Sequence, residues 1–284
     1  MTLMNLPRAV SRLLMSLLLV PVLAGLVHAQ TATQQAPATK EEFKPVVGQA
    51  GKDVVWVPTP QVVTDRMLDV AKITPQDFVV DLGSGDGRNI ITAAKRGARG
   101  RGVEFNPEMV ALSRRTAEKE GVADRATFVE GDMFAAEFND ATVLALFLLP
   151  ANLDKLRDKF LALKPGTRIV ANTFWIDGWE PDFRDQLSDT ECTEWCNVML
   201  FIVPARVDGA WRLPQGELAI KQSFQKFTGT LTESGRVTSI TDGKLNGDEI
   251  TFTAGTFKYS GRVNGDRIEG TSTPGGPFSA TRAK

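Results

Sequence analysis

The stretch that decides the fold runs from Phe78 to Asn89 and reads FVVDLGSGDGRN. In it an apolar run ends in an acid, three glycines alternate with polar residues, and a helix-like segment begins. This order predicts a buried strand that turns sharply into a helix. Glycines allow the backbone to approach a ligand closely, and a helix N-terminus presents free N–H groups to a negative group. The stretch therefore predicts a ligand-binding turn.

The spacing of acids and glycines narrows the class of ligand. A dinucleotide fingerprint reads G-x-G-x-x-G and has its acid about 20 residues later. Here the pattern is D-x-G-x-G-x-G, with Asp81 at the strand end, and Glu104 ends the next apolar segment. This layout resembles the class I S-adenosylmethionine methyltransferases. The alternative is another nucleotide-binding turn or a purely structural one.

That resemblance implies a role for each residue of the turn. Asp81 would face the ammonium group of the cofactor, directly or through water, and Glu104 would accept hydrogen bonds from both ribose hydroxyls. The loop under the methionine part of the cofactor would consist of Gly83, Ser84, Gly85 and Gly87.

Two other segments offer cofactor contacts. Asp132 follows the third apolar run and could accept from the adenine amino group, with Met133 or Phe134 against the ring. The alternative for Asp132 is a loop acid that caps the next segment. Thr59, in the Val-Pro-Thr-Pro segment, could reach the cofactor carboxylate or cap the helix that begins near Gln61.

Residues 45–203 alternate strand-like and helix-like segments, which predicts a parallel sheet covered by helices on both faces. The expected fold class is α/β, a Rossmann-like doubly wound sheet. Ligands bind at the carboxyl ends of such strands. The expected strands are Phe78–Asp81, Ala98–Glu104, Ala126–Glu130, Thr142–Leu148 and Arg168–Thr173. The expected helices are Gln61–Lys72, Arg88–Arg96, Pro107–Gly121 and Leu153–Leu163.

The character of the chain changes after Pro204. Residues 204–284 are rich in Gly, Thr and alternating apolar residues, and they contain the similar stretches Gly243–Ile250 and Gly261–Ile268. Asn-Gly between alternating runs is a strong hairpin signal. We expect a small antiparallel β-rich domain, a meander or a partial barrel.

The N-terminus has the pattern of an export signal. Arg8 and Arg12 precede the apolar run Leu13–Val27, and small residues precede Gln30. This predicts a signal peptide over residues 1–29, cleaved after Ala29, then a flexible linker over residues 30–44. The expected location is the periplasm. The alternative is an uncleaved segment that anchors the protein to the membrane.

Composition excludes several kinds of chemistry. The only histidine is His28, so a cleaved chain has no histidine for a catalytic triad or a metal site. No metal is expected, and a net charge of −1 gives no support for nucleic-acid binding. Cys192 and Cys196 are spaced C-x3-C, which leaves a local disulfide and two buried thiols near an interdomain turn as alternatives.

The acceptor side of the site is less defined. Relatives that methylate amines often carry an acid or amide followed by prolines after the fourth strand, where this chain is apolar apart from Pro150. Phe147 and Pro150 could shape a methyl-transfer channel or belong to the core. The aromatics of Phe174–Glu180 have the same two interpretations. No catalytic residue is predicted.

Five segments together resemble one subgroup, the small seven-β-strand lysine methyltransferases related to the mitochondrial enzymes that modify ATP synthase and the adenine nucleotide translocase. The segments are Val57–Pro60, Asp81–Arg88, Gly102–Pro107, Leu163–Gly166 and Gly178–Pro181. The resemblance covers less than half the chain.

This resemblance implies S-adenosylmethionine as cofactor and methyl transfer to an amine, with a protein lysine as the candidate acceptor. Two other functions stay open. One is a small-molecule methyltransferase with the C-terminal region as a lid. The other is a non-catalytic envelope protein that binds S-adenosylmethionine or a related nucleoside, because this cofactor is not expected to be abundant outside the cytoplasm.

Overall fold

The computed structural model describes residues 42–188, 190, 192–214 and 216–283. The expected signal peptide and the linker up to residue 41 lie outside the described residues, as does His28. Residues 43–284 cluster as one compact unit, and every element below belongs to it. Among the described residues, no helix has the length and apolar character needed to cross a membrane.

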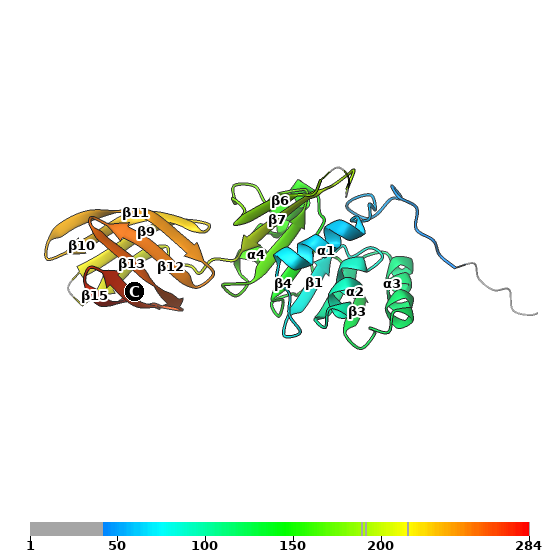
Figure 1. The fold of residues 1–284 in the computed structure, drawn as a ribbon, viewed down its shortest axis with the longest axis horizontal. Coiled ribbons are helices and arrows are strands. Elements are labelled where there is room, and N and C mark those ends of the chain that lie inside the picture. The colour runs from blue at the N-terminus through cyan, green and yellow to red at the C-terminus, as the bar shows by residue number, and fades with distance from the viewer. Residues whose placement is uncertain (1–41, 189, 191, 215, 284) are drawn as a thin grey trace, which may run out of the picture. The chain divides into compact units, whose positions relative to one another are not determined.

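The first part of this unit is a seven-stranded sheet in the order β3-β2-β1-β4-β5-β7-β6 (Figure 1). Strands β1 to β5 run parallel, β7 is antiparallel to β5, and β6 is antiparallel to β7. The bounds are β1 Phe78–Leu82, β2 Arg99–Glu104, β3 Ala126–Glu130, β4 Val143–Leu146, β5 Arg168–Asn172, β6 Phe183–Gln186 and β7 Asn197–Ile202.

Helices cover both faces of this sheet. Alternate residues of a strand therefore pack into two different hydrophobic cores, one on each face. Val79 and Val143 pack in the core that contains side chains of the first three helices. Val80 and Leu144 pack in the core that contains Leu153, Leu156 and Phe160 of α4. The expected doubly wound α/β class is confirmed. The helices are α1 Gln61–Val70, α2 Arg88–Lys95, α3 Pro107–Lys119 and α4 Pro150–Leu161.

Several element boundaries differ from the expectation by one to three residues, and two of these lie at the segment between the fourth strand and the fourth helix. The fourth strand ends at Leu146 rather than Leu148, and α4 begins at Pro150 rather than Leu153. Proline suits the first helical position because its missing N–H would have no partner there and its φ is already helical. Strands β6 and β7 were not predicted. At α3 the expected cap is confirmed, since the Asn106 side chain accepts from the Glu108 amide at 2.9 Å.

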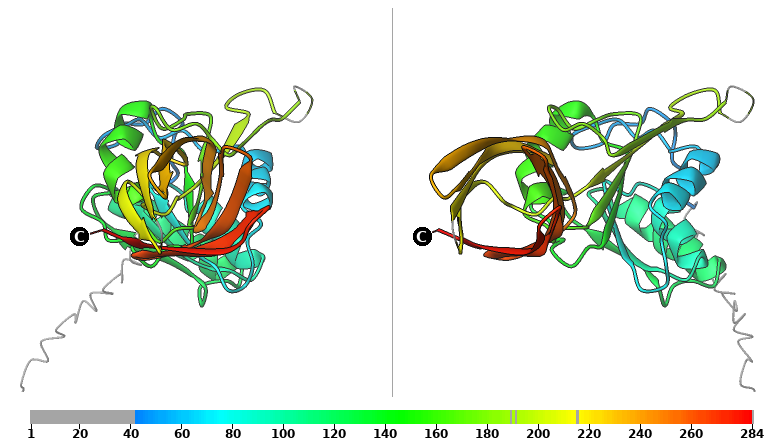
Figure 2. Two further views of the ribbon diagram at one scale, coloured as in Figure 1. Left: turned by 90° about the vertical axis from the view of Figure 1, so that its left-hand side faces the viewer. Right: turned by 60° about the vertical axis from the view of Figure 1, so that its left-hand side comes forward.

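The C-terminal strands form a closed antiparallel barrel (Figure 2). The sequence predicted a meander or partial barrel, but β15 pairs with β8 through Thr281 and Arg212 and closes the ring. Large side chains fill the interior, among them Trp211 and Tyr259, whose ring stacks on Phe252 at 4.5 Å. The strands are β8 Gly209–Leu213, β9 Gly216–Ser223, β10 Lys226–Glu233, β11 Arg236–Asn246, β12 Glu249–Ala254, β13 Phe257–Asn264, β14 Arg267–Thr273 and β15 Gly276–Arg282.

Both copies of the sequence repeat form tight hairpins. Asn246 pairs with Glu249 across the β11–β12 turn, and Asn264 pairs with Arg267 across the β13–β14 turn. The glycine after each asparagine has a positive φ, which a two-residue turn of this kind requires. The hairpin prediction is therefore confirmed. The domain boundary expected between residues 203 and 204 stays a prediction; it falls between the end of β7 and the start of β8.

Candidate active site

A cavity of about 210 Å³ opens at the carboxyl ends of the parallel strands. Gly83 follows β1, Glu104 ends β2, Asp132 follows β3, and Phe147 and Phe174 follow β4 and β5. A segment before α1, residues 49–57, forms another wall, and Trp195 from the β6–β7 loop completes the lining. This position agrees with the rule that open α/β sheets bind ligands beyond the carboxyl ends of their strands.

The glycine loop is shaped by what packs against it. Gly85 and Gly87 have φ values of 55° and 82°, a region that side chains rarely adopt. A Cβ at Gly85 would lie 2.5 Å from the indole nitrogen of Trp56, and a Cβ at Gly87 would lie 2.6 Å from the ring of Phe128. These glycines are therefore required by the close approach of aromatic rings as well as by the turn.

Glu104 joins the glycine loop to the start of α3. One carboxylate oxygen accepts from the Gly85 amide and the other from the Asn106 amide, both at 2.9 Å. Each oxygen has a second lone pair, so the carboxylate can still accept from the cavity side. Glu104 lines the cavity and is half-buried, which suits an acceptor of ribose hydroxyls.

Asp81 lies behind the loop and is almost fully buried. Its carboxylate accepts from the Asn89 amide at 3.0 Å, and the oxygen of Asn89 accepts from the Thr64 hydroxyl at 2.9 Å. Burial raises the pKa of Asp81 well above its usual range; the bond from Asn89 opposes this, while the charges of Glu104 and Asp86 add to it. A nearby cation would stabilise the ionised form.

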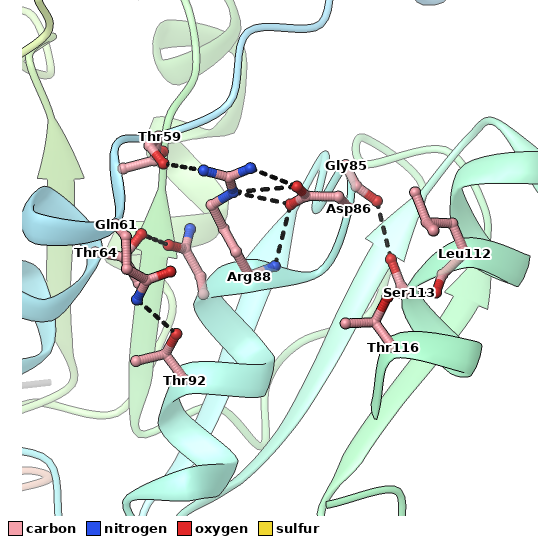
Figure 3. Close-up of polar contacts among 11 residues, drawn as sticks. Thr59, Gln61, Thr64, Gly85, Asp86, Arg88, Thr92, Leu112, Ser113 and Thr116 are labelled. Atoms are coloured by element: carbon pink, nitrogen blue, oxygen red, sulfur yellow. Dashed lines mark hydrogen bonds and ion pairs between the residues drawn. The ribbon is translucent and has the colours of Figure 1, made fainter. Parts of the chain in front are cut away.

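Arg88 ties the loop to the segment before α1 (Figure 3). Its guanidinium pairs with the carboxylate of Asp86 at 2.5 Å and donates to the backbone carbonyl of Thr59 at 2.6 Å. Thr59 does not cap α1, because Pro60 occupies the cap position and no side chain bonds there. On the other side of the loop, the Ser113 hydroxyl donates to the Gly85 carbonyl at 3.0 Å.

Asp132 is held from two directions. One oxygen accepts from the Phe134 amide at 2.8 Å, the capping role that the sequence left open, and the other pairs with Lys52 at 2.7 Å. The hydrogen bond from Lys52 lowers the pKa of Asp132, so the carboxylate is charged at neutral pH. Lys52 also lies 4.9 Å from the ring centre of Phe105, and so closes one side of the cavity.

The structure brings four of the nine predicted cofactor residues into this cavity: Gly83, Glu104, Asp132 and Met133. The other five do not line it: Ser84, Gly85 and Gly87 belong to the loop itself, while Thr59 and Asp81 contact Arg88 and Asn89 at the start of α2. Ser84 is buried and its hydroxyl has no hydrogen-bond partner. The contacts that we assigned to all nine stay predictions.

Sequence reasoning missed the wall formed by residues 49–57, and it missed Trp195. No periodicity marks the first segment; Trp56 beside the Val-Pro-Thr-Pro stretch was its only signal. Cys192 and Cys196 form a disulfide, so of the two alternatives the disulfide is the one present. The other alternative, two buried thiols near an interdomain turn, was wrong, since the disulfide lies between β6 and β7 of the first sheet.

The aromatics after β4 and β5 have different environments. Phe147 and Phe174 line the cavity, Trp179 is buried in the core, and Trp175 is 56% exposed. Pro150 begins α4 and does not line the cavity. In the part of the chain that the structure describes, no group of acidic, cysteine or histidine side chains is placed to hold a metal ion.

The cavity suits an adenosyl cofactor. Glu104 and Asp132 supply charged acceptors at two places, while Val103, Met133 and Leu148 supply apolar surface between them. A nucleoside has the matching chemistry, with hydroxyl and amino donors around a flat ring. An added Cβ at Gly83 would lie 3.5 Å from Leu148 and 3.8 Å from Met133, so these two apolar side chains pack over this glycine.

Comparison with known proteins places the chain in a class and a family. Residues 81–183 match the ANTKMT methyltransferase domain. A protein-lysine N-methyltransferase of Saccharolobus islandicus is 46% identical over 131 residues, which is 45% of this chain and 81% of the relative. A lysine N-methyltransferase of Rattus norvegicus, named for ATP synthase, is 38% identical over 157 residues, which is 55% of this chain and 68% of the relative.

A solved structure agrees with these relatives. An RNA methyltransferase from Salinibacter ruber, crystallised with S-adenosyl-L-homocysteine, is 41% identical, has a TM-score of 0.50, and covers 53% of this chain and 96% of its own. The fold and the cavity define an S-adenosylmethionine-dependent methyltransferase. Within that class, the chain belongs to the ANTKMT methyltransferase family.

Proposed function

We propose that this methyltransferase acts on the side-chain amine of a protein lysine, at a site in the cell envelope. The observation that supports this acceptor is the charge distribution of the cavity. Its acids are Asp53 before α1, Glu104 at the end of β2 and Asp132 after β3, while its β4 and β5 side is aromatic and uncharged. A neutral amine can approach such a surface, whereas an anionic acceptor would lack a partner there. Two of the relatives described above are lysine methyltransferases by name and support the same acceptor, whereas the solved structure is named as an RNA methyltransferase.

S-adenosylmethionine supplies a methyl group activated on a sulfonium, so the chain's own residues mainly bind, orient and exclude water. Glu104 and Asp132 would hold the adenosyl part, with Met133 against the ring. Because lysine is protonated in water, the acceptor must lose a proton before it attacks. The apolar surface of Phe147, Leu148 and Phe174 removes water from the entering side chain; the ring faces can hold the ammonium as it docks, and water at the cavity mouth takes the proton before the neutral amine attacks.

The exported location is part of this proposal. The N-terminal signal pattern supports it, and the Cys192–Cys196 disulfide is of a kind that persists in oxidising compartments. With an uncleaved N-terminal segment the same domain would stay at the membrane. Fractionation of cells that express the full chain, with N-terminal sequencing of the product, would test this: a start at Gln30 in the periplasmic fraction supports cleavage.

The acceptor is tested with methyl-labelled S-adenosylmethionine. The purified chain 30–284 would be incubated separately with envelope proteins, with total RNA and with a small-molecule extract of the same cells. Label in a protein band, mapped to lysine by mass spectrometry, supports the proposal. Label only in RNA or only in a metabolite would refute it.

Two controls make the result specific. Glu104→Ala should strongly reduce labelling in every fraction when the cofactor is below saturation, because it removes a cofactor contact. S-adenosyl-L-homocysteine should inhibit labelling in proportion to its occupancy. Cofactor binding with no label in any of the three fractions would favour the non-catalytic alternative.

A further inference from the structure

Three aromatic side chains from separate parts of the sequence meet at one wall of the cavity. Phe147 follows β4, Phe174 follows β5, and Trp195 precedes β7. The ring centres are 6.1 Å apart for Phe147–Phe174, 5.7 Å for Phe147–Trp195 and 5.8 Å for Phe174–Trp195. We call these three residues the aromatic wall. Since the rings touch one another, a ligand must lie against the wall rather than between its members.

The chemistry of this wall matches a cation. The face of an aromatic ring is electron-rich and attracts an ammonium within about 6 Å of its centre. Among the described residues, the cations that lie over aromatic rings use rings outside the wall, as Arg184 does over Trp175. The charged residues of the cavity lining are Lys52, Asp53, Glu104 and Asp132, so three acids and one already paired lysine share the cavity with the wall. Three acids against one lysine leave the lining net negative, which favours a second cation.

The backbone at the wall is held in conformations that ordinary residues avoid. Trp195 has φ 59°, and Thr173, directly before Phe174, has φ 63°. A bulky or β-branched residue at positive φ is a rare outlier, stabilised only where surrounding structure demands it. Two of the three wall residues therefore depend on strained backbone, which indicates that their placement serves a purpose beyond core packing.

The disulfide explains how Trp195 stays at the wall. Cys192 and Cys196 close a short ring around it, and the Leu187 amide donates to the Cys196 carbonyl at 3.0 Å. The tryptophan is still 38% exposed. A partly exposed indole on an unrestrained loop would sample many positions, so the covalent closure restricts it to the mouth of the cavity.

We infer that the aromatic wall is the acceptor subsite, that it binds an alkylammonium side chain, and that the disulfide positions Trp195 within it. This rests on the proposed function for the identity of the acceptor as a lysine. Methylation makes an ammonium larger and less hydrated without removing its charge. The wall therefore accepts the singly and doubly methylated side chain as well, which permits successive transfers to one nitrogen.

Binding rather than turnover tests the inference. The probes are Nα-acetyl-trimethyllysine amide and its uncharged isostere, in which carbon replaces the side-chain nitrogen. Each is titrated into chain 30–284 saturated with S-adenosyl-L-homocysteine. We expect the charged probe to bind roughly five- to thirtyfold more tightly than the isostere, the range for cation–π contacts. Equal affinities, or no binding of either probe, would overturn the inference.

Variants locate the probe. Trp195→Leu and Phe174→Leu should remove the preference for the charged probe, Trp195→Phe should retain part of it, and Trp175→Leu, next to the wall but outside it, should leave it unchanged. The double variant Cys192→Ser/Cys196→Ser should behave like Trp195→Leu. Binding of S-adenosyl-L-homocysteine reports folding in every variant. A preference that survives both Trp195→Leu and Phe174→Leu would overturn the assignment.

The same data separate this inference from the proposed function. A charged-probe preference in a protein that labels only RNA or a metabolite would leave the wall as an ammonium site and refute lysine methylation. Label on a lysine, with no preference for the charged probe, would support lysine methylation and refute the wall as an ammonium site.

Discussion

The carboxylate of Glu104 accepts a hydrogen bond from the backbone amide of Gly85 at 2.9 Å, which fixes the end of β2 to the middle of the glycine loop. The same carboxylate receives the Asn106 amide, so one side chain orders both the loop and the start of α3. Glu104 thus has a structural role in the free protein and a predicted ligand role on the cavity side.

Glu104→Ala should weaken binding of S-adenosylmethionine and S-adenosyl-L-homocysteine by about ten- to a hundredfold, because hydrogen bonds to a charged group contribute roughly 1.5–3 kcal/mol. Isothermal calorimetry gives the dissociation constants. Glu130→Ala is the matched control, since this exposed acid ends the neighbouring strand β3 and does not line the cavity. Equal affinities of the two variants would refute a ligand role for Glu104.

Asp81→Asn should separate stability from binding. Because burial raises the pKa of Asp81 in the folded protein, the native state holds a proton that the unfolded chain loses above its value of 3.8. The native state therefore binds more protons in that range, and this group makes stability fall as pH rises. Asp81→Asn should lack this decrease of stability with rising pH, and it should bind the cofactor more weakly. Denaturant unfolding from pH 4 to pH 8 would measure the difference.

Cofactor binding should also release the proton of Asp81. An ammonium beside the carboxylate favours its ionised form. Calorimetry of S-adenosyl-L-homocysteine in buffers of different ionisation enthalpy counts the released protons. We expect release from the wild type at a pH where Asp81 is still protonated, and none from Asp81→Asn. Adenosine, which lacks the ammonium, should release none from either protein; equal release by both ligands would contradict the assignment.

Gly85→Ala tests the approach of Trp56 to the loop. The new methyl group would lie 2.5 Å from the indole nitrogen, at a backbone φ of 55°. We expect a lower melting temperature and a severalfold loss of cofactor affinity, because Trp56 lines the cavity. Gly121→Ala controls for the backbone alone, since its φ is 69° and nothing lies within 4 Å of the added carbon. That variant should lose only about 1–2 kcal/mol of stability, with unchanged affinity.

Asp77→Asn should destabilise the sheet without touching the cavity. Burial alone would raise the pKa of Asp77, but hydrogen bonds from Thr142 and Thr74 and the charge of Arg168 hold it below its ordinary value. Because its pKa is lower in the folded protein, the Asp77 carboxylate stabilises the fold at pH values above its unfolded pKa of 3.8. This stabilisation is lost as the pH falls through the pKa of the folded state.

The expected loss for Asp77→Asn is roughly 2 kcal/mol at pH 7, and it should shrink toward zero in acid. Thermal unfolding between pH 3 and pH 7 would show this. Asp140→Asn, which breaks an exposed pair with Arg101, is the control and should change stability by less than about 1 kcal/mol.

The sequence predicted the structure best where a local pattern is compatible with only one backbone conformation. The apolar run ending in Asp81 and alternating glycines placed β1, the loop and α2 to within about a residue of their bounds. Glu104 was identified for the same reason, because the end of a second parallel strand must lie beside the first. The paired Asn-Gly stretches likewise specified two hairpins of the C-terminal region.

Other parts of the site depend on contacts that a local pattern does not contain. Lys52 reaches Asp132 across 80 positions of sequence, and Trp195 meets Phe147 only because the β6–β7 loop folds back. Pro150 was left between the expected strand, which ended at Leu148, and the expected helix, which began at Leu153, although proline also suits the first helical position. Closure of the barrel required Thr281 to pair with Arg212, a long-range choice that alternation alone does not make.

The barrel also gives the protein a built-in spectroscopic label. The chain has a single tyrosine, and it is Tyr259, buried in the barrel interior against Phe252. Burial, with a smaller contribution from Glu233, raises the pKa of its phenol. Phenolate absorbance during an alkaline titration therefore reports the opening of the barrel alone, with no signal from the domain that carries the cofactor.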